Sequence, residues 1–185
     1  MKKLSLAVLL ALSCTAQAGG FITLEGEYEN IHGSTNDVRS LNIIPGAKLN
    51  NGVTLDLKTQ LQSKKDDQTV SGNIEPRVRY DYKIGMTDFT VWGRAGIGEK
   101  IANGANFGYY TLEPGISYKA TPDLNLFVSD RYRDAFADGK GYQTNTIYLG
   151  SSYKVTDVDS IGAKAYRKYG DTESNGFEVN YTRSF

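Results

Sequence analysis

The chain has 185 residues, with 21 basic and 21 acidic side chains, and this length suits about one domain. A net charge near zero argues against a protein that binds nucleic acid or a charged membrane surface, because both need a basic excess. The mean hydropathy of −0.42 is polar. After the N-terminus, no apolar run approaches the roughly 18 residues of a transmembrane helix.

The first 18 residues have the organisation of a secretory signal peptide. Two lysines are followed by an apolar run over residues 4–12, and Ala16-Gln17-Ala18 fits the small-residue cleavage rule. A short membrane anchor is disfavoured because the apolar run is too short to span a bilayer. We therefore predict a signal peptide over residues 1–18 and an exported domain over residues 19–185.

After residue 20, apolar and polar residues alternate strictly, which is the period of a β-strand. In the clearest segment, Val53, Leu55 and Leu57 alternate with Thr54 and Asp56. No stretch has the period of an amphipathic helix. The predicted strands are residues 21–31, 38–49, 53–62, 74–83, 89–98, 109–119, 124–134, 144–154, 160–169 and 177–185.

The connections between these strands alternate between short and long. The short ones are residues 50–52, 84–88, 120–123 and 155–157, and the long ones are 32–37, 63–71, 99–106, 135–143 and 170–176. Outer-membrane barrels have short periplasmic turns, longer outer loops and an even number of strands. We therefore predict an all-β, antiparallel transmembrane β-barrel of about ten strands, with twelve or eight as the alternatives.

Aromatic residues favour the barrel over a soluble sandwich, whose alternation would look the same. They recur near the ends of the apolar faces, as the interfacial girdles of membrane barrels do. They are Tyr28, Tyr80, Tyr82, Tyr110, Tyr118, Tyr132, Tyr153, Tyr169 and Phe185. A C-terminal aromatic residue, here Phe185, also resembles the terminal signal of bacterial outer-membrane barrels, so the barrel-assembly machinery is an expected partner.

Three prolines lie inside predicted strands. Pro45, Pro76 and Pro114 fall in the second, fourth and sixth strands, on the apolar face. Proline cannot donate to a ladder. We expect a local bulge or a gap in the ladder at each proline, or strands that start only after it.

The run from Leu112 to Asp134, LEPGISYKATPDLNLFVSDRYRD, resembles the oligogalacturonate-specific porins of enterobacterial outer membranes. The similar features are the Pro-x-aliphatic-x-Tyr strand, the short turn and a following strand with Arg131-Tyr132-Arg133. The stretch LNNGVTLDLK is also similar. The resemblance implies a monomeric channel whose arginines and lysines pass acidic oligosaccharides. Those porins have twelve strands, so the ten predicted here imply a narrower lumen.

The polar faces of the strands are the candidate lumen lining. Guanidinium groups suit carboxylates, and Arg77 with Arg79, or Arg131 with Arg133, are about 7 Å apart along one strand. Glu25, Glu27 and Glu29 could neutralise several of the arginines. The predicted substrate-binding residues are Lys58, Arg77, Arg79, Arg94, Arg131, Arg133, Lys164, Lys168, Glu25, Glu27 and Glu113.

Nothing in the sequence indicates an enzyme, and we predict no catalytic residue, metal site or cofactor. The only histidine, His32, is in a predicted outer loop without an orienting partner. The only cysteine, Cys14, lies in the predicted signal peptide, so no His/Cys cluster can bind a metal.

These observations predict a bacterial outer-membrane channel for passive diffusion of small anionic solutes such as acidic oligosaccharides. The expected partners are membrane lipid and lipopolysaccharide together with that solute, and a monomer is expected. The alternative is a non-conducting barrel with a structural or surface-interaction role, because small barrels are often filled by paired side chains.

Overall fold

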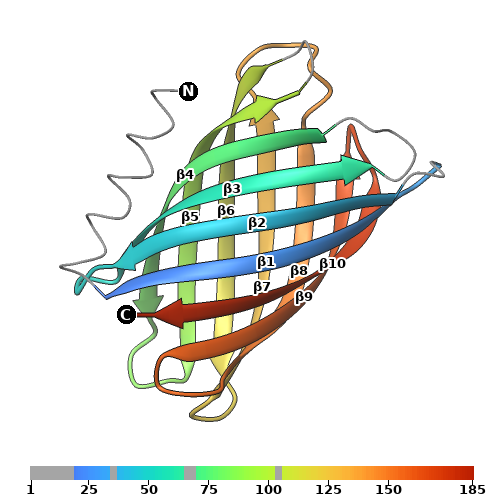
Figure 1. Ribbon diagram of the computed structural model, residues 1–185. Helices are drawn as coiled ribbons and strands as arrows, with labels where there is room; N and C mark the ends of the chain where they lie inside the picture. Colours follow the sequence, from blue (N-terminus) through green and yellow to red (C-terminus); the bar gives the residue numbers. More distant parts are fainter. Residues whose placement is uncertain (1–18, 34–36, 65–69, 103–105) are drawn as a thin grey trace.

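The computed structural model describes residues 19–33, 37–64, 70–102 and 106–185, which form one closed antiparallel barrel (Figure 1). The predicted signal peptide lies outside the described residues. The prediction of ten strands is confirmed. They are β1 (Gly20–Ile31), β2 (Asp37–Lys48), β3 (Val53–Lys64), β4 (Val70–Lys83), β5 (Phe89–Ile101), β6 (Phe107–Lys119), β7 (Leu124–Ala135), β8 (Thr144–Lys154), β9 (Asp159–Gly170) and β10 (Ser174–Ser184).

Each strand pairs with its neighbours in sequence, and β1 closes the barrel against β10. If the paired residues are followed from strand to strand once around the barrel, the path returns to β1 at a residue 12 positions further along the strand. This offset is the stagger of the barrel. A closed sheet with such a stagger has strands tilted by about 35–45° from its axis. The stagger decides which inward side chains reach the same level of the lumen.

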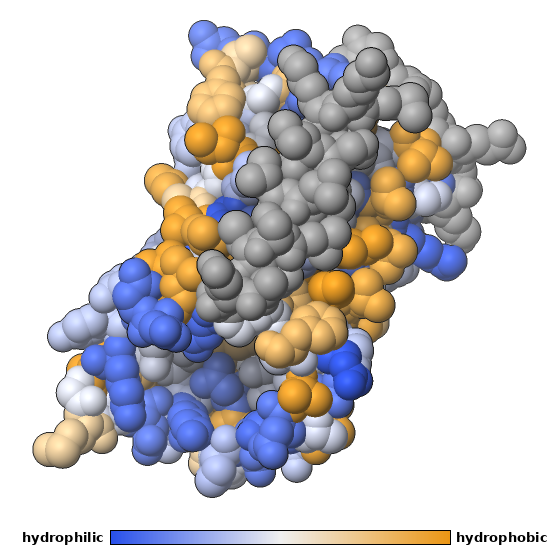
Figure 2. All heavy atoms as spheres, turned by 60° about the vertical axis from the view of Figure 1, so that its left-hand side comes forward, coloured by the Kyte–Doolittle hydropathy of each residue, from blue (hydrophilic) through white to orange (hydrophobic). Residues whose placement is uncertain are grey.

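The two faces of the sheet are inverted relative to a soluble protein. Outward side chains are apolar and exposed, such as Leu61 at 52% and Leu149 at 67%. Inward side chains are polar and buried, such as Asn42 at 0% and Glu178 at 1%. Figure 2 shows the apolar side chains gathered along the flank of the barrel. Such a large exposed apolar surface is a membrane-contact feature.

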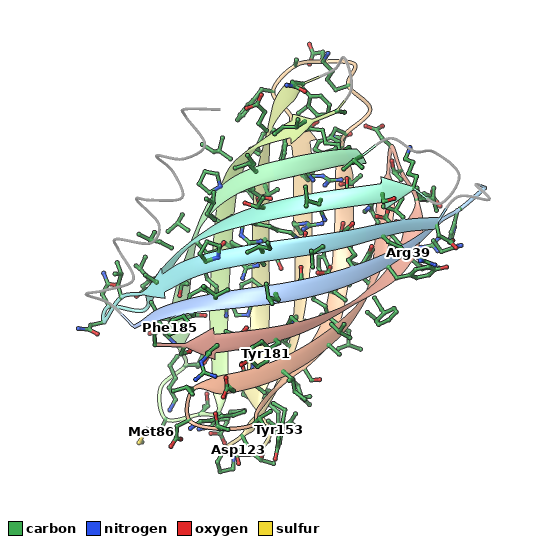
Figure 3. All side chains as sticks on the ribbon, in the orientation of Figure 1. Arg39, Met86, Asp123, Tyr153, Tyr181 and Phe185 are labelled. Atoms are coloured by element: carbon green, nitrogen blue, oxygen red, sulfur yellow. The ribbon has the colours of Figure 1, made fainter. Side chains whose placement is uncertain are left out.

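The two ends of the barrel also differ. We call the end with the turns after β2, β4, β6 and β8 the short-turn end, and the opposite end the long-loop end. Exposed aromatic residues lie at both ends: Tyr153 and Phe185 at the short-turn end (Figure 3), and Tyr28, Phe136 and Tyr169 at the long-loop end. Arg39 lies at the long-loop end (Figure 3). Within the described part of the chain, no helix has the length and apolar character needed to cross a membrane.

The three prolines interrupt ladders without changing the register. Pro45, Pro76 and Pro114 each pair with the preceding strand, but their positions are missing from the pairing with the following strand. The register is the same on both sides of each interruption. The expected ladder gap is therefore confirmed and the bulge is not, because proline lacks the N–H but keeps the extended backbone.

Five inward aromatic rings lie against glycines of the neighbouring strand. In each pair the ring occupies the space that a Cβ on the glycine would fill. The pairs are Phe21 with Gly46, Trp92 with Gly115, Tyr109 with Gly98, Phe127 with Gly150, and Tyr166 with Gly176. The missing side chain lets each ring cover the barrel wall, the arrangement by which aromatic residues stabilise glycines in strands.

Candidate functional site: the barrel lumen

The lumen contains a wide cavity and a narrow one. The wide cavity, of about 480 Å³, occupies the short-turn half and shares Phe21, Thr54 and Thr182 with the open mouth at that end. The narrow cavity, of about 60 Å³, lies toward the long loops. Lys58 and Arg131 line both cavities, so these two residues mark the level at which the lumen narrows.

A buried ionic cluster occupies this level. Lys164 Nζ lies 3.1 Å from Glu25 Oε2 and 2.9 Å from Glu178 Oε2. Lys58 Nζ is 3.4 Å from Glu25 Oε1, which also accepts a hydrogen bond from Asn42 Nδ2 at 2.7 Å. Buried charges need such partners, and here the partners come from β1, β2, β3, β9 and β10.

In the wide half, three arginines have carboxylate partners on the barrel wall. Arg77 Nε donates to Asp56 Oδ1 at 2.6 Å, and Arg94 Nη1 donates to Glu113 Oε2 at 3.2 Å. Both of these pairs join residues that are directly opposite on neighbouring strands. Their charges therefore stay along the wall.

Arg79 completes this wall. Its Nη2 donates to Asp81 Oδ1 on the same strand at 2.6 Å, and its Cζ lies 4.0 Å from the ring centroid of Trp92. A guanidinium over an indole is a favourable cation–π contact. The ring and the carboxylate together hold this arginine beside the wall.

In the narrow half, hydrogen bonds reach over an intervening strand. Tyr166 on β9 donates to Glu27 on β1 at 2.7 Å, passing over Gly176 of β10. Gln60 on β3 donates to the same Glu27 at 2.9 Å, across β2. Lys168 contacts Glu29, again from β9 to β1. We call such contacts, between side chains on strands two apart in the barrel, chords. Because chords cross part of the lumen, they narrow it.

The same geometry appears on the opposite wall. Thr111 Oγ1 and Tyr109 Oη on β6 donate to Glu75 on β4 at 2.6 and 3.2 Å. They reach over β5, where Gly96 and Gly98 leave the space that a side chain would fill. The glycines of the narrow half therefore permit the chords.

Two arginines have no carboxylate partner. Among the described residues, neither Arg131 nor Arg133 has a carboxylate within ion-pair distance, and the buried Nε atom of each has no hydrogen-bond partner. Arg133 Cζ lies 3.9 Å from the ring centroid of Tyr142, and Arg131 Cζ lies 5.2 Å from that of Tyr148. Aromatic faces stabilise these cations without neutralising them, while Glu113 and Glu75 act on Arg131, and Glu29 on Arg133, only from beyond ion-pair distance.

Tyr142 reaches the narrow cavity from the connection between β7 and β8. Its ring meets Phe107 and Tyr109 edge-on, with centroid separations of 4.9 and 5.2 Å. Gly139 and Gly141, with φ of 72° and 60°, supply the left-handed backbone that turns the segment inward. Burial raises the pKa of the Tyr142 hydroxyl, which therefore stays neutral.

The structure places every predicted substrate-binding residue on the wall of one or both cavities, while their role in binding stays a prediction. The expectation that Glu25, Glu27 and Glu29 neutralise several arginines is not met by direct contacts, although Arg133 acts on Glu29 from a longer distance. These glutamates meet lysines and neutral donors, because β1 lies beside β2 and β10 and only two strands from the lysine-bearing β3 and β9.

Sequence reasoning did not select the aromatic residues that line the lumen. Trp92, Tyr148 and Tyr166 occupy positions that alternate with the apolar residues of their strands. This spacing alone could have identified them as inward-facing. Tyr142 lies in a connection, where the alternation carries no information. Among the described residues, no three His, Cys, Asp or Glu side chains are grouped so that they could hold a metal ion.

Searches against protein-family models and against curated proteins gave no match. Solved structures share the fold. The β domain of the Bordetella autotransporter BrkA is 10% identical, with a TM-score of 0.63, covering 90% of this chain and 99% of that one. The COG4313 outer-membrane channel from Pseudomonas putida F1 is 10% identical, with a TM-score of 0.60 and coverages of 91% and 96%.

The KdgM porin, in complex with disordered oligogalacturonate, is 15% identical, with a TM-score of 0.53 and coverages of 89% and 99%. This neighbour supports the resemblance to outer-membrane porins at the level of the fold. The chain thus has the fold of outer-membrane barrels, which channels share with an autotransporter domain, and its function must be argued from the lumen.

Proposed function

We propose that this protein is a passive, narrow channel of a bacterial outer membrane that prefers small anionic solutes. The short-turn end faces the periplasm in this proposal, and the long loops face outward, as in other outer-membrane barrels. The solved outer-membrane channels with the same fold support this location and role. Acidic sugars are a further solute class to test after small anions, because the KdgM porin structure is a complex with an oligogalacturonate.

The observation that carries the proposal is the pair of guanidiniums without a direct carboxylate contact, Arg131 and Arg133, on the wall where the lumen narrows. Overall, ten basic and seven acidic residues line the two cavities. Charged rings at constrictions select ions by sign. An excess of positive charge at the narrowest level therefore favours anions over cations.

The size of the narrow cavity limits the solute. A cavity of about 60 Å³ has room for only a few water molecules. An inorganic anion requires only small side-chain movements to pass, whereas an acidic oligosaccharide requires the chords of the narrow half to open. We therefore propose small anions as the main solutes.

The test is the single-channel current of the purified protein in a planar lipid bilayer under a salt gradient. We expect small, resolvable steps and a reversal potential on the anion-selective side. The double substitution Arg131→Glu, Arg133→Glu should move the reversal potential toward cation selectivity. The control is the double substitution Arg39→Glu, Arg183→Glu on the outer face of the barrel. It makes the same change in charge outside the lumen and should leave the reversal potential unchanged. An unchanged reversal potential in the first variant would remove Arg131 and Arg133 from the selectivity site.

The buried cluster of Lys164, Glu25 and Glu178 favours a second candidate, a non-conducting barrel that stabilises the envelope or contacts other molecules. Glu178 is 1% exposed and Glu25 is 4% exposed, so the cluster shields much of the lumen at its midpoint. The same bilayer experiment separates the two functions, since a plugged barrel gives no resolvable steps.

A further inference from the structure

The outward face of β7 carries a carboxylate within an otherwise apolar stripe. Asp130 is exposed, and along this face it lies between Val128 and Tyr132. Among the described residues, it makes no ion pair and no hydrogen bond. A carboxylate that faces hydrocarbon is unfavourable unless it finds a partner. The single barrel does not supply that partner.

A cation lies in the same row of the sheet, two strands away. Asp130 pairs with Ile147 of β8, and Ile147 pairs with Arg167 of β9. Two strand spacings separate Asp130 from Arg167 by about 10 Å, which is too far for an ion pair. Each charge also precedes an outward tyrosine by two residues, Tyr132 on β7 and Tyr169 on β9.

Arg167 has polar and aromatic partners within the single barrel, including the Tyr169 ring 5.2 Å from its Cζ, but its contact with a carboxylate is long. Its Nη2 is 3.6 Å from Glu173 Oε2, and its Nη1 donates to Asn175 Oδ1 at 3.0 Å and lies 2.7 Å from His32 Nε2. The side chain keeps 32% of its surface exposed. A guanidinium has five donors, so Arg167 can accept a further carboxylate.

Between the two charges, large apolar side chains of β8 form a ridge on the outer surface, and small side chains of β9 form a shallow strip beside it. On β8, Ile147 and Leu149 are 48% and 67% exposed. On β9, the outward residues opposite Leu149 and Ser151 are Ala165 and Ala163. Small residues in membrane surfaces allow a neighbouring backbone to approach closely, so this strip can receive the ridge of another molecule.

We propose that the β7–β9 face is the interface of a homodimer. In it, Asp130 pairs with Arg167 of a second copy, around a two-fold axis along the membrane normal near Ile147. This rotation keeps each residue at its depth and brings β7 of one copy against β9 of the other. Because the strands are tilted by about 35–45°, Asp130 and Arg167 differ in depth by roughly 6 Å, a distance that the long Arg167 side chain can span. The ion pair is therefore made twice, as an isologous interface requires. Leu149 of each copy packs over the alanine strip of the other.

This assembly replaces the monomer expected from the sequence. It rests on the outer-membrane location in the proposed function, but it does not depend on conduction. Asp130 and Arg167 point away from the lumen, so their substitution should leave the reversal potential in place. Failure of the dimer and failure of the channel are therefore distinguishable.

The first test is disulfide cross-linking across the axis in membrane vesicles, in a Cys14→Ser background. Ile147→Cys should give a covalent dimer under mild oxidation, because a residue at a two-fold axis meets its own copy. Leu41→Cys is the matched control, since Leu41 is an outward apolar residue of β2 with 49% exposure against 48% for Ile147. Equal cross-linking at both positions, or none at Ile147→Cys, would overturn the proposal.

The second test exchanges the charges. Arg167→Asp places two carboxylates together and should weaken dimerisation by about tenfold or more, measured by sedimentation in detergent. Asp130→Arg alone should act in the same way, and the double variant Asp130→Arg, Arg167→Asp should restore the dimer. Heat-modifiable gel migration confirms that each variant is a folded barrel. A folded double variant that stays monomeric would contradict the assigned ion pair.

Discussion

The two halves of the lumen use similar residues with opposite results. In the wide half, charged pairs such as Arg77 with Asp56 stay on one strand or join neighbouring strands. In the narrow half, pairs such as Tyr166 with Glu27 reach over a whole strand. The comparison shows that the direction of a pair, rather than its chemistry, decides whether charged side chains leave a barrel open or close it.

The largest effect should come from the ionic cluster at the start of the narrow half. Lys164→Met leaves Glu25 and Glu178 without their shared cation, and removal of one partner from a buried cluster costs about 3–5 kcal/mol. The free energy of unfolding in urea measures this loss in refolded protein.

The control for that variant lies in the wide half. Arg79→Met breaks a partly exposed pair with Asp81, with side-chain exposures of 24% and 22%, and should cost only about 1 kcal/mol. Equal losses in the two variants would show that the buried cluster contributes no more to stability than a partly exposed pair.

A smaller effect should follow from filling the space under a chord. In Gly176→Ala, the new Cβ meets the ring of Tyr166 and displaces it from Glu27, at a cost of about 1–3 kcal/mol. Thermal or urea unfolding measures the change.

Gly93→Ala provides the comparison, because a Cβ on this outward glycine meets nothing within 4 Å. Its stability should stay within about 0.5 kcal/mol of the parent protein. If Gly176→Ala is as neutral as Gly93→Ala, Tyr166 can hold its position without the glycine, and the role given to the glycines in the narrow half is wrong.

Tyr142→Ala should change the stability least among these variants. It should nevertheless change the single-channel current clearly. Its ring lies in the narrow cavity but belongs to a connection rather than to a strand. Removal of the ring should increase the single-channel conductance, since the narrow half limits the current. Phe127→Ala, in the wide half, should leave the conductance nearly the same. A larger gain for Phe127→Ala would place the limiting section at the other end.

The candidate site was predictable in part. The alternation assigned Arg77, Arg79, Arg131 and Arg133 to the lumen, and all four line it. It could not distinguish the first pair, which has carboxylate partners, from the second, which has only aromatic ones. Except for Asp81, which lies on the same strand as Arg79, those partners come from other strands or from a connection, and their levels depend on the registers between strands.

By itself, the sequence determined the number of strands, the two ends and the face of each side chain, because a period of two residues fixes these locally. The tertiary structure decided which side chains meet. A stagger of 12 residues around the barrel sets the level of every strand relative to the others. Glu25 could therefore be assigned to the lumen from its neighbours in sequence, whereas its contacts with Lys58 and Lys164 exist only because the closed sheet brings three strands to one level.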